Sequence, residues 1–343
     1  MIEDKTHIHI VNSKFFALDF KVNNKHINDL LAKNADLADK LYITLGKDNL
    51  DEIGKWRAED FEEYYNCVKT ADILVGYDFP TQNLAGYAPF LRWIHIMISG
   101  VEHLSPFSWI SPKMKLINNK GVHTPKAGES FATYLGMLNS AMPRLMTAQR
   151  NHKWERLFTT VIKGKKLVVL GVGCQGGEMA KRGKDMGLHV IGIDPYCRQH
   201  PSCDKIVRIE EMQEVLKDAD FLAITAPLTE ETKGIIGKEA LGWLPKHAGL
   251  INVSRGQLLD ENALDEKLRN GDLSGAILDV FDTEPLPEES PLWTTPNLII
   301  TPHVSSDDVV NYIPRTLDLT IKNLRNELAG LPMINVIDTS KEF

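Results

Sequence analysis

The chain has 343 residues, 43% of them apolar, which is enough for two domains with separate cores. Its 39 basic and 46 acidic residues give a net charge of -7, which argues against binding to nucleic acid or to an anionic membrane. The first residues lack a basic region followed by an apolar core, and no apolar run is long enough to cross a bilayer. We therefore expect a cytoplasmic protein that does not enter membranes.

From the start of the chain to about residue 119, short apolar runs alternate with stretches of helical character. We expect strands at residues 8–11, 40–45, 71–76, 92–98 and 114–117. This alternation predicts an α/β unit with a parallel sheet. One helix is predicted next, over residues 127–149.

A second α/β unit follows. Its strands are expected at residues 167–170, 190–193, 221–225, 249–253, 275–279 and 298–301, a spacing typical of a doubly wound sheet. The pairs Thr124-Pro125 and Thr301-Pro302 are expected hinges, because proline disfavours helix at the residue before it. An amphipathic helix at residues 308–328 then returns to the first unit. We therefore predict that residues 126–302 form one domain, inserted into a second domain made of residues 1–125 and 303–343.

The strand at residues 167–170 leads into a turn with three glycines, Gly171, Gly173 and Gly176, and then into a predicted helix. In such a turn the first glycine permits the sharp bend, the second lets the backbone approach a pyrophosphate, and the third lets the helix pack on the strand. Asp194 ends the next strand, where a carboxylate binds the hydroxyls of an adenosine ribose. Its charge would repel a 2′-phosphate, so NAD is favoured over NADP. Alternatively, Asp194 only caps the turn beside Pro195.

Three later segments carry a cation, a carboxylate and an imidazole at expected strand ends. Arg255 lies in the run Asn-Val-Ser-Arg-Gly, Glu284 in Asp-Val-Phe-Asp-Thr-Glu-Pro, and His303 in Thr-Pro-His. Each residue alone has a structural alternative: a surface ion pair for Arg255, a turn for Glu284 and a buried histidine for His303. Together they favour a reactive site, because the carboxyl ends of parallel strands meet at one edge of a sheet.

These segments together resemble the D-isomer-specific 2-hydroxyacid dehydrogenases, as do the glycine turn and the run Pro-Leu-Thr-Glu-Glu-Thr at residues 227–232. The resemblance covers nearly the whole second unit. It implies a doubly wound Rossmann-type NAD-binding domain inserted into a smaller flavodoxin-like α/β substrate domain, and a homodimer built around residues 127–149. The residues expected to contact NAD(H) are Gly171, Gly173, Gln175, Gly176, Asp194, Pro227, Thr232, Ser254 and Asp279.

The resemblance also implies an oxidoreductase that acts on the CH-OH group of 2-hydroxy acids, with Arg255, Glu284 and His303 as catalytic residues. Reduction of a 2-keto acid places charge on the carbonyl oxygen, so a proton donor must lie within hydrogen-bond reach of that oxygen. His303 is the expected donor and acceptor, and Glu284 would orient its ring. The planar guanidinium of Arg255 matches a substrate carboxylate and would polarise the ketone.

The substrate side is assigned by the same resemblance. Ser99, Gly100 and Val101 correspond to the loop whose backbone amides receive the substrate carboxylate. Tyr77 and Phe79 follow the strand at residues 71–76 and are expected to face the substrate.

Two further interpretations stay open at this point. One is phosphoglycerate dehydrogenase activity; formate is disfavoured, because formate dehydrogenases pair a Gln with the histidine, where this chain has Glu284. The other is an NAD(H)-sensing regulatory protein of the same fold, although a sensor does not need a proton donor. The four cysteines show no Cys-x-x-Cys spacing, so we expect free thiols and no metal.

Overall fold

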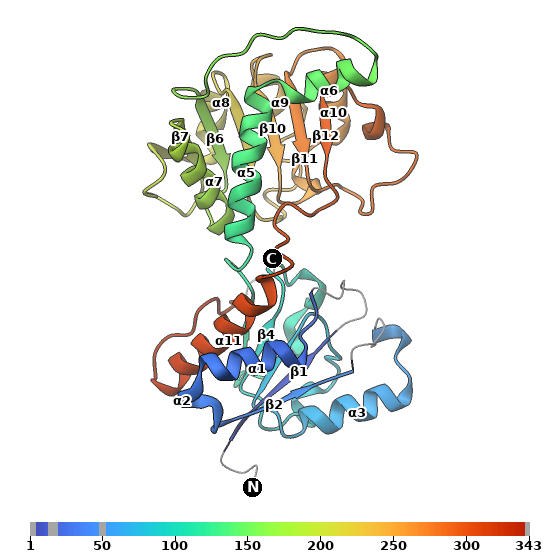
Figure 1. Cartoon of the computed structure of the whole chain (residues 1–343), viewed down its shortest axis with the longest axis vertical. Coiled ribbons are helices and arrows are strands. Elements are labelled where there is room, and N and C mark those ends of the chain that lie inside the picture. The colour runs from blue at the N-terminus through green and yellow to red at the C-terminus, as the bar shows by residue number, and fades with distance from the viewer. Residues whose placement is uncertain (1–4, 13–19, 48–52, 340–343) are drawn as a thin grey trace. The chain divides into compact units, whose positions relative to one another are not determined.

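The computed structural model describes residues 5–12, 20–47 and 53–339 (Figure 1). The chain separates into two compact units. Unit 1 comprises Met1–His123 and Asp308–Phe343, and unit 2 comprises Thr124–Asp307. Each unit is built on its own parallel sheet.

Unit 1 contains a five-stranded sheet with the order β2-β1-β3-β4-β5. This is the flavodoxin-like order, as expected. All its pairings are parallel; Ile8, for example, lies between Ile43 and Ile73. The strands are β1 (Thr6–Val11), β2 (Leu41–Leu45), β3 (Ile73–Gly76), β4 (Trp93–Ile96) and β5 (Lys115–Ile117), and the helices are α1 (Asn24–Lys33), α2 (Ala35–Ala38), α3 (Ala58–Val68), α4 (Leu84–Tyr87) and α11 (Tyr312–Leu328).

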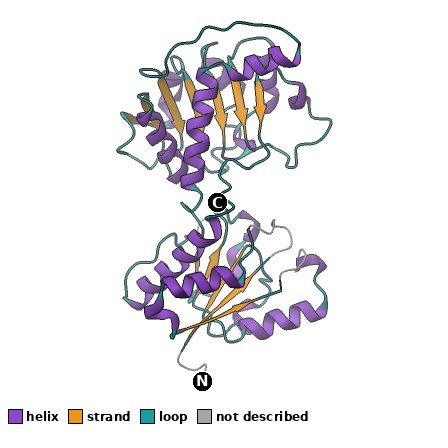
Figure 2. Ribbon diagram, viewed as in Figure 1, coloured by secondary structure: helices purple, strands orange, loops and turns teal. Residues whose placement is uncertain are grey.

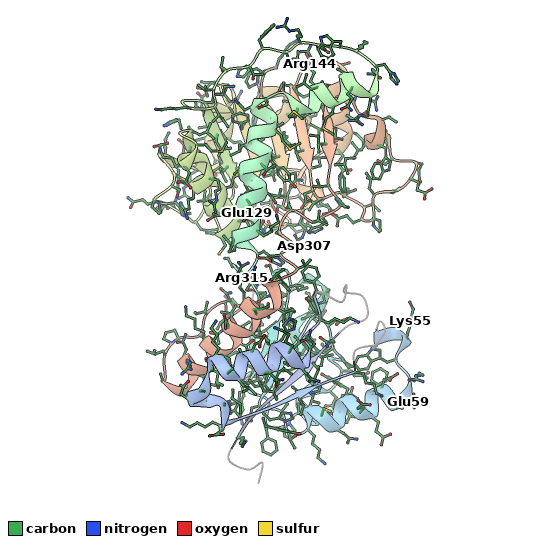
Figure 3. All side chains as sticks on the ribbon, viewed as in Figure 1. Lys55, Glu59, Glu129, Arg144, Asp307 and Arg315 are labelled. Atoms are coloured by element: carbon green, nitrogen blue, oxygen red, sulfur yellow. The ribbon has the colours of Figure 1, made fainter. Side chains whose placement is uncertain are left out.

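Helix α11 brings the end of the chain back onto the sheet of unit 1. Its buried residues Ile313, Leu317, Ile321 and Leu324 share a cluster with residues of β1 and β3, as the amphipathic pattern predicts. The helix begins at Tyr312 rather than at residue 308. The carboxylate of Asp308 accepts a hydrogen bond from the Asn311 amide at 3.0 Å and pairs with Arg315 at 2.7 Å; Arg315 is labelled in Figure 3.

Unit 2 contains a seven-stranded parallel sheet with the order β12-β11-β10-β9-β6-β7-β8. Counted from the strand before the glycine turn, this is the doubly wound order 3-2-1-4-5-6 with one more strand, so the predicted Rossmann-type fold is confirmed. The strands are β6 (Lys166–Leu170), β7 (His189–Ile193), β8 (Lys205–Val207), β9 (Phe221–Ile224), β10 (Gly249–Asn252), β11 (Gly275–Leu278) and β12 (Leu298–Ile300). Of these, β8 was not predicted.

Helices cover both faces of this sheet (Figure 2). Along β6, Val168 and Leu170 enter a core shared with α8 (Met212–Leu216), α9 (Lys238–Trp243) and α10 (Glu261–Arg269). The alternate residues Leu167 and Val169 enter a core shared with α5 (Thr124–Asn139) and α7 (Cys174–Asp185). Both faces of β6 are therefore apolar, as expected for a parallel strand covered on both sides.

The prediction of one helix over residues 127–149 is wrong. The chain forms α5 (Thr124–Asn139) and then α6 (Met142–Arg150). Between them Ala141 has a φ of 54°, in the left-handed region, and Pro143 lies in the first turn of α6, where its missing amide costs no helical hydrogen bond. Thr124 and Pro125 begin α5, so this expected hinge is the first turn of a helix.

Within the part of the chain that the structure describes, no helix is long and apolar enough to span a lipid bilayer. All four cysteines are free thiols.

Candidate active site

The turn between β6 and α7 uses its three glycines in three different ways. Gly171 has a φ of +88°, and a Cβ on it would lie 2.5 Å from the Cα of Ala226. A Cβ on Gly176 would lie 1.8 Å from the carbonyl oxygen of Gly171. Gly173, by contrast, would place its Cβ in open space, and it precedes α7 as an N-cap residue that makes no side-chain hydrogen bond. The amide groups in the first turn of α7 are thus left accessible at the positive end of the helix, which suits an anionic ligand.

Asp194 joins the end of β7 to this turn. Its carboxylate accepts hydrogen bonds from the backbone amides of Val172 at 2.8 Å, Tyr196 at 2.8 Å and Cys197 at 2.7 Å. The structure therefore gives Asp194 the turn-capping contacts that the sequence offered as the alternative. A carboxylate has about four acceptor positions, so three amides leave one for a ribose hydroxyl.

Three other residues expected to contact the cofactor lie along the loops after β9 and β10. The Thr232 hydroxyl donates to the Pro227 carbonyl at 2.7 Å, which closes the turn between them. The Ser254 hydroxyl donates to the Ala226 carbonyl, directly before Pro227. These bonds fix the loops to each other at the carboxyl end of the sheet.

Glu284 and His303 are brought together although they follow different strands. Glu284 Oε2 lies 2.8 Å from His303 Nδ1, and Glu284 Oε1 accepts a hydrogen bond from the Phe281 amide at 2.9 Å. One oxygen of the Glu284 carboxylate is therefore fixed by its own turn, and the other contacts the imidazole of His303. The His303 side chain keeps 48% of its surface exposed, so the ring can be reached by a small molecule.

The backbone at His303 is itself unusual. Its φ is 54°, in the left-handed region, and its amide donates to the carbonyl of Asp279 at 2.8 Å. Asp279 is buried, and its carboxylate accepts hydrogen bonds from the Thr301 and Ser305 hydroxyls, both at 2.6 Å, and from the Val304 amide at 3.0 Å. Asp279 thus shapes the segment that presents His303, a role that the sequence motifs did not reveal.

Arg255 follows β10, the neighbour of β11 in the sheet. Its guanidinium donates to the Ser254 carbonyl at 2.8 Å. The next residue, Gly256, packs so tightly that a Cβ on it would lie 1.8 Å from the carbonyl carbon of Phe281. The segment that carries Arg255 therefore lies directly against the turn that carries Glu284.

The residues expected on the substrate side lie in unit 1. Ser99, Gly100 and Val101 follow β4, and the Ser99 carbonyl accepts a hydrogen bond from the Asn118 side chain at 2.6 Å. The side chains of Tyr77 and Phe79 are 3% and 1% exposed and belong to the core. Tyr77 donates its hydroxyl to the Phe20 carbonyl at 3.0 Å.

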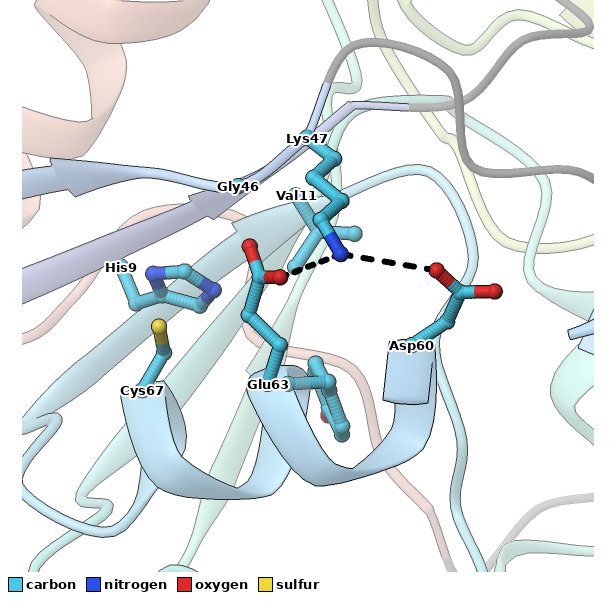
Figure 4. A pocket seen from close by; sticks show the side chains of 8 residues that line it. His9, Val11, Gly46, Lys47, Asp60, Glu63 and Cys67 are labelled. Carbon is cyan, nitrogen blue, oxygen red and sulfur yellow. Dashed lines mark ion pairs between the residues drawn. The ribbon is translucent and has the colours of Figure 1, made fainter. Parts of the chain in front are cut away.

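Three histidines of unit 1, His7, His9 and His95, are buried and belong to no predicted site. Burial lowers the pKa of His9 to about 4, and nearby His7 acts in the same direction. Figure 4 shows His9 beside Cys67, in a pocket that Lys47 closes through ion pairs with Asp60 and Glu63. Burial likewise lowers the pKa of His95 to about 4; its ring hydrogen-bonds Thr320 at 2.7 Å.

No group of three or more histidine, cysteine, aspartate or glutamate side chains could hold a metal ion among the described residues.

Comparisons with known proteins point the same way. The model of the family described as "D-isomer specific 2-hydroxyacid dehydrogenase, NAD binding domain" matches residues 133–305. D-3-phosphoglycerate dehydrogenase of Methanocaldococcus jannaschii is 32% identical over 276 residues, which are 78% of this chain and 52% of that protein. The chain thus spans about half of that relative's length.

Two further matches extend over more of the other protein. Glyoxylate reductase of Korarchaeum cryptofilum is 30% identical over 228 residues, which are 64% of this chain and 68% of that protein. The solved structure of a D-isomer specific 2-hydroxyacid dehydrogenase family protein from Aeromonas salmonicida superimposes with a TM-score of 0.77 at 27% identity, over 98% of this chain and 100% of that chain.

Proposed function

Because the chain belongs to the D-isomer specific 2-hydroxyacid dehydrogenase family, we propose that it transfers hydride between NAD(H) and a small 2-keto or 2-hydroxy acid. The observation that carries the proposal is the 2.8 Å contact between Glu284 and His303 beside the segment of Arg255. In this proposal, unit 2 binds the cofactor and unit 1 contributes to substrate binding. The domain boundaries that we predicted at residues 125/126 and 302/303 belong to the same proposal.

The residues of unit 2 fit a dinucleotide. The uncapped first turn of α7 and the open space at Gly173 suit a pyrophosphate, and Gly171, Gln175 and Gly176 complete that turn. Asp194 would accept a ribose hydroxyl through its remaining acceptor position, and its charge would disfavour the 2′-phosphate of NADP(H). Pro227, Thr232, Ser254 and Asp279 would border the rest of the cofactor. When bound, NADH supplies the hydride that is added to the carbonyl carbon of the substrate.

The protein's own part in the reaction is to hold charges and to move one proton. Glu284 occupies His303 Nδ1, so Nε2 would donate a proton to the carbonyl oxygen during reduction and accept it during oxidation. Arg255 would bind the substrate carboxylate and polarise the ketone. In unit 1, the backbone amides of Ser99, Gly100 and Val101 are the groups that we propose for substrate binding. Tyr77 and Phe79 remain in the proposal as residues of the substrate side; both are buried, and Phe79 shares an apolar cluster with Val101.

We include a homodimer in the cytoplasm in the proposal. The segment after α6 carries Trp154, Phe158 and Val161, whose exposed fractions are 94%, 84% and 78%. Large apolar side chains at such exposure are typical of an interface, and this segment adjoins the helical region at residues 127–149 where the dimer was expected. Sedimentation of the protein, with Trp154→Arg as the disrupting variant, tests this part: a monomeric parent protein contradicts it.

The test of the function is a panel of 2-keto acids with NADH and NADPH, followed at the absorbance of reduced nicotinamide. The panel comprises glyoxylate, hydroxypyruvate, pyruvate and longer and aromatic analogues, with oxidation of D-3-phosphoglycerate as a separate assay. Turnover of at least one substrate, faster with NADH, supports the proposal. Tight NADH binding without turnover of any substrate would favour the NAD(H)-sensing alternative instead.

A further inference from the structure

One carboxylate close to the catalytic pair has no part in the function proposed so far. Glu261 is the first residue of α10, and its Oε1 accepts a hydrogen bond from the Asp282 amide at 2.8 Å, across 21 residues of sequence. Asp282 lies in the turn that carries Glu284. Glu261 therefore links a helix of the scaffold to that turn.

The start of α10 does not need this carboxylate as a cap. Asp260 already caps the helix, and its side chain accepts a hydrogen bond from the Ala263 amide at 2.9 Å. A carboxylate in the first turn of a helix contributes only about 0.3–1 kcal/mol through the helix dipole. The contact with Asp282 is the more specific use of the Glu261 side chain.

The position is electrostatically unfavourable, which argues against a purely stabilising role. Burial raises the pKa of Glu261, and the charges of Asp282 and Glu284 act in the same direction, while the hydrogen bond from Asp282 opposes them. A half-buried carboxylate that faces two others costs stability unless its hydrogen bond compensates.

Glu261 is one of three contacts that hold the same turn. The Gln257 side chain donates to the Asp282 carbonyl at 2.8 Å, and Gly256 packs against the peptide between Phe281 and Asp282. Both come from the segment that begins with Arg255. Gly256, Gln257 and Glu261 thus all contact the Phe281–Asp282 part of the turn that carries Glu284, and all three follow Arg255 within six residues of sequence.

We propose that Glu261 is a positioning residue, whose hydrogen bond to the Asp282 amide keeps Glu284 against His303 and in register with Arg255. This inference rests on the proposed function, because Glu261 acts through Glu284. The proposed role requires that the Glu261 side chain accepts a hydrogen bond. It does not require that this side chain is charged.

Two variants distinguish these properties. Glu261→Ala removes the acceptor, and we expect kcat for the best 2-keto acid to fall about 10- to 100-fold with little change in the KM for NADH, because small displacements of catalytic groups have effects of this size. Glu261→Gln keeps an acceptor oxygen and removes the charge, so its kcat should stay within about threefold of the parent value. Glu266→Ala is the matched control, since Glu266 lies on the same helix in an exposed ion pair with Lys238.

A second measurement does not depend on turnover. A proton on His303 Nδ1 that is hydrogen-bonded to Glu284 should give a downfield NMR signal, which is assigned by its loss in His303→Gln. We expect this signal in the parent, Glu261→Gln and Glu266→Ala proteins, and its broadening or loss in Glu261→Ala.

The outcomes separate the inference from the function it rests on. If the parent protein turns over no substrate, the proposed function is refuted. If the His303 signal is nevertheless present in the parent protein and lost in Glu261→Ala, the positioning role is supported. An active parent with parent-like kcat and signal in Glu261→Ala overturns the inference alone. Equal losses in Glu261→Ala and Glu261→Gln also overturn it, because charge rather than hydrogen bonding would then be responsible.

Discussion

His303 is held at two atoms, one in its imidazole ring and one in its backbone. Its Nδ1 contacts Glu284, and its backbone amide donates to the Asp279 carbonyl. A ring held in this way presents its other nitrogen in one direction, which is what a proton donor for a single carbonyl oxygen requires.

Replacement of His303 by asparagine is expected to separate binding from chemistry. Loss of a general acid commonly costs about 100-fold or more in rate, so kcat for keto-acid reduction should fall by at least this factor. Titration of NADH fluorescence should give a Kd close to that of the parent protein, since the residues proposed to bind the cofactor are unchanged. His247→Asn, at an exposed histidine, is the control. Parent-like turnover in His303→Asn would refute the proton-donor role.

Asp194 is expected to decide between the two nicotinamide cofactors. In Asp194→Ser, kcat/KM with NADPH should rise relative to kcat/KM with NADH by about tenfold or more, which corresponds to about 1.4 kcal/mol. Asp194→Asn is the informative companion, because it loses the charge but keeps one acceptor oxygen, which can serve either the Val172 amide or the Tyr196 and Cys197 amides. If the ratio is the same in all three proteins, the charge of Asp194 does not set the preference.

At the scale of elements, the turn from β6 to α7 offers a paired test with two glycines. Gly176→Ala would place a methyl group 1.8 Å from the Gly171 carbonyl oxygen, so the backbone must move, and unfolding should become easier by about 2 kcal/mol or more. Gly173→Ala meets no atom within 4 Å, so its unfolding midpoint should change little.

The same two variants test the predicted pyrophosphate position. If backbone at Gly173 approaches the cofactor, Gly173→Ala should weaken NADH binding about tenfold while the fold stays intact. Thermal unfolding and NADH titration measure the two effects separately. Unchanged NADH affinity in Gly173→Ala would mean that the cofactor does not approach this residue.

Elements with a strong apolar signal could be predicted from the sequence. The four residues of β3 and of β9, for example, are all buried and lie within predicted apolar runs. β8 was missed because only Val207 of its three residues is buried. The break after α5 was missed because Ala141, which adopts the left-handed conformation, carries no local signal for it.

Arg255, Glu284 and His303 could be proposed as catalytic residues only because several motifs occur together. Their contacts could not, since they join segments that lie far apart in sequence: Glu284 meets His303 across 19 residues, and Glu261 meets Asp282 across 21. The same is true of Asp279, whose partners at Thr301, Val304 and Ser305 follow the next strand. Such pairings depend on sheet order and loop packing, which no local pattern encodes.

At the scale of the whole molecule, the buried histidines of unit 1 make its stability depend on pH, because burial lowers the pKa of His7, His9 and His95. His9 and His95 have a pKa of about 4 in the folded protein, against about 6.5 in the unfolded chain. The unfolded state therefore binds more protons between these values, and the free energy of unfolding should fall as the pH drops from about 6.5 to about 4. Above pH 6.5 neither residue contributes to the pH dependence.

The expected loss is of the order of 3 kcal/mol for each of His9 and His95 across that range. Urea unfolding at a series of pH values measures it. His95→Gln should reduce the slope of the unfolding free energy against pH, even if it lowers stability at pH 7, while the slope due to His7 and His9 remains. A slope identical to that of the parent protein would show that His95 becomes protonated without a penalty in the folded state.

Gly256 illustrates how mutational data on this protein should be interpreted. Any side chain at position 256 would collide with the peptide between Phe281 and Asp282 and force apart the segments of Arg255 and Glu284. A saturation scan scored by growth or turnover would consequently rank this position with the reactive residues. Gly256 has no side chain that could take part in a reaction. Loss of activity on its substitution would therefore reflect a change in the spacing of two loops and not the loss of a chemical group.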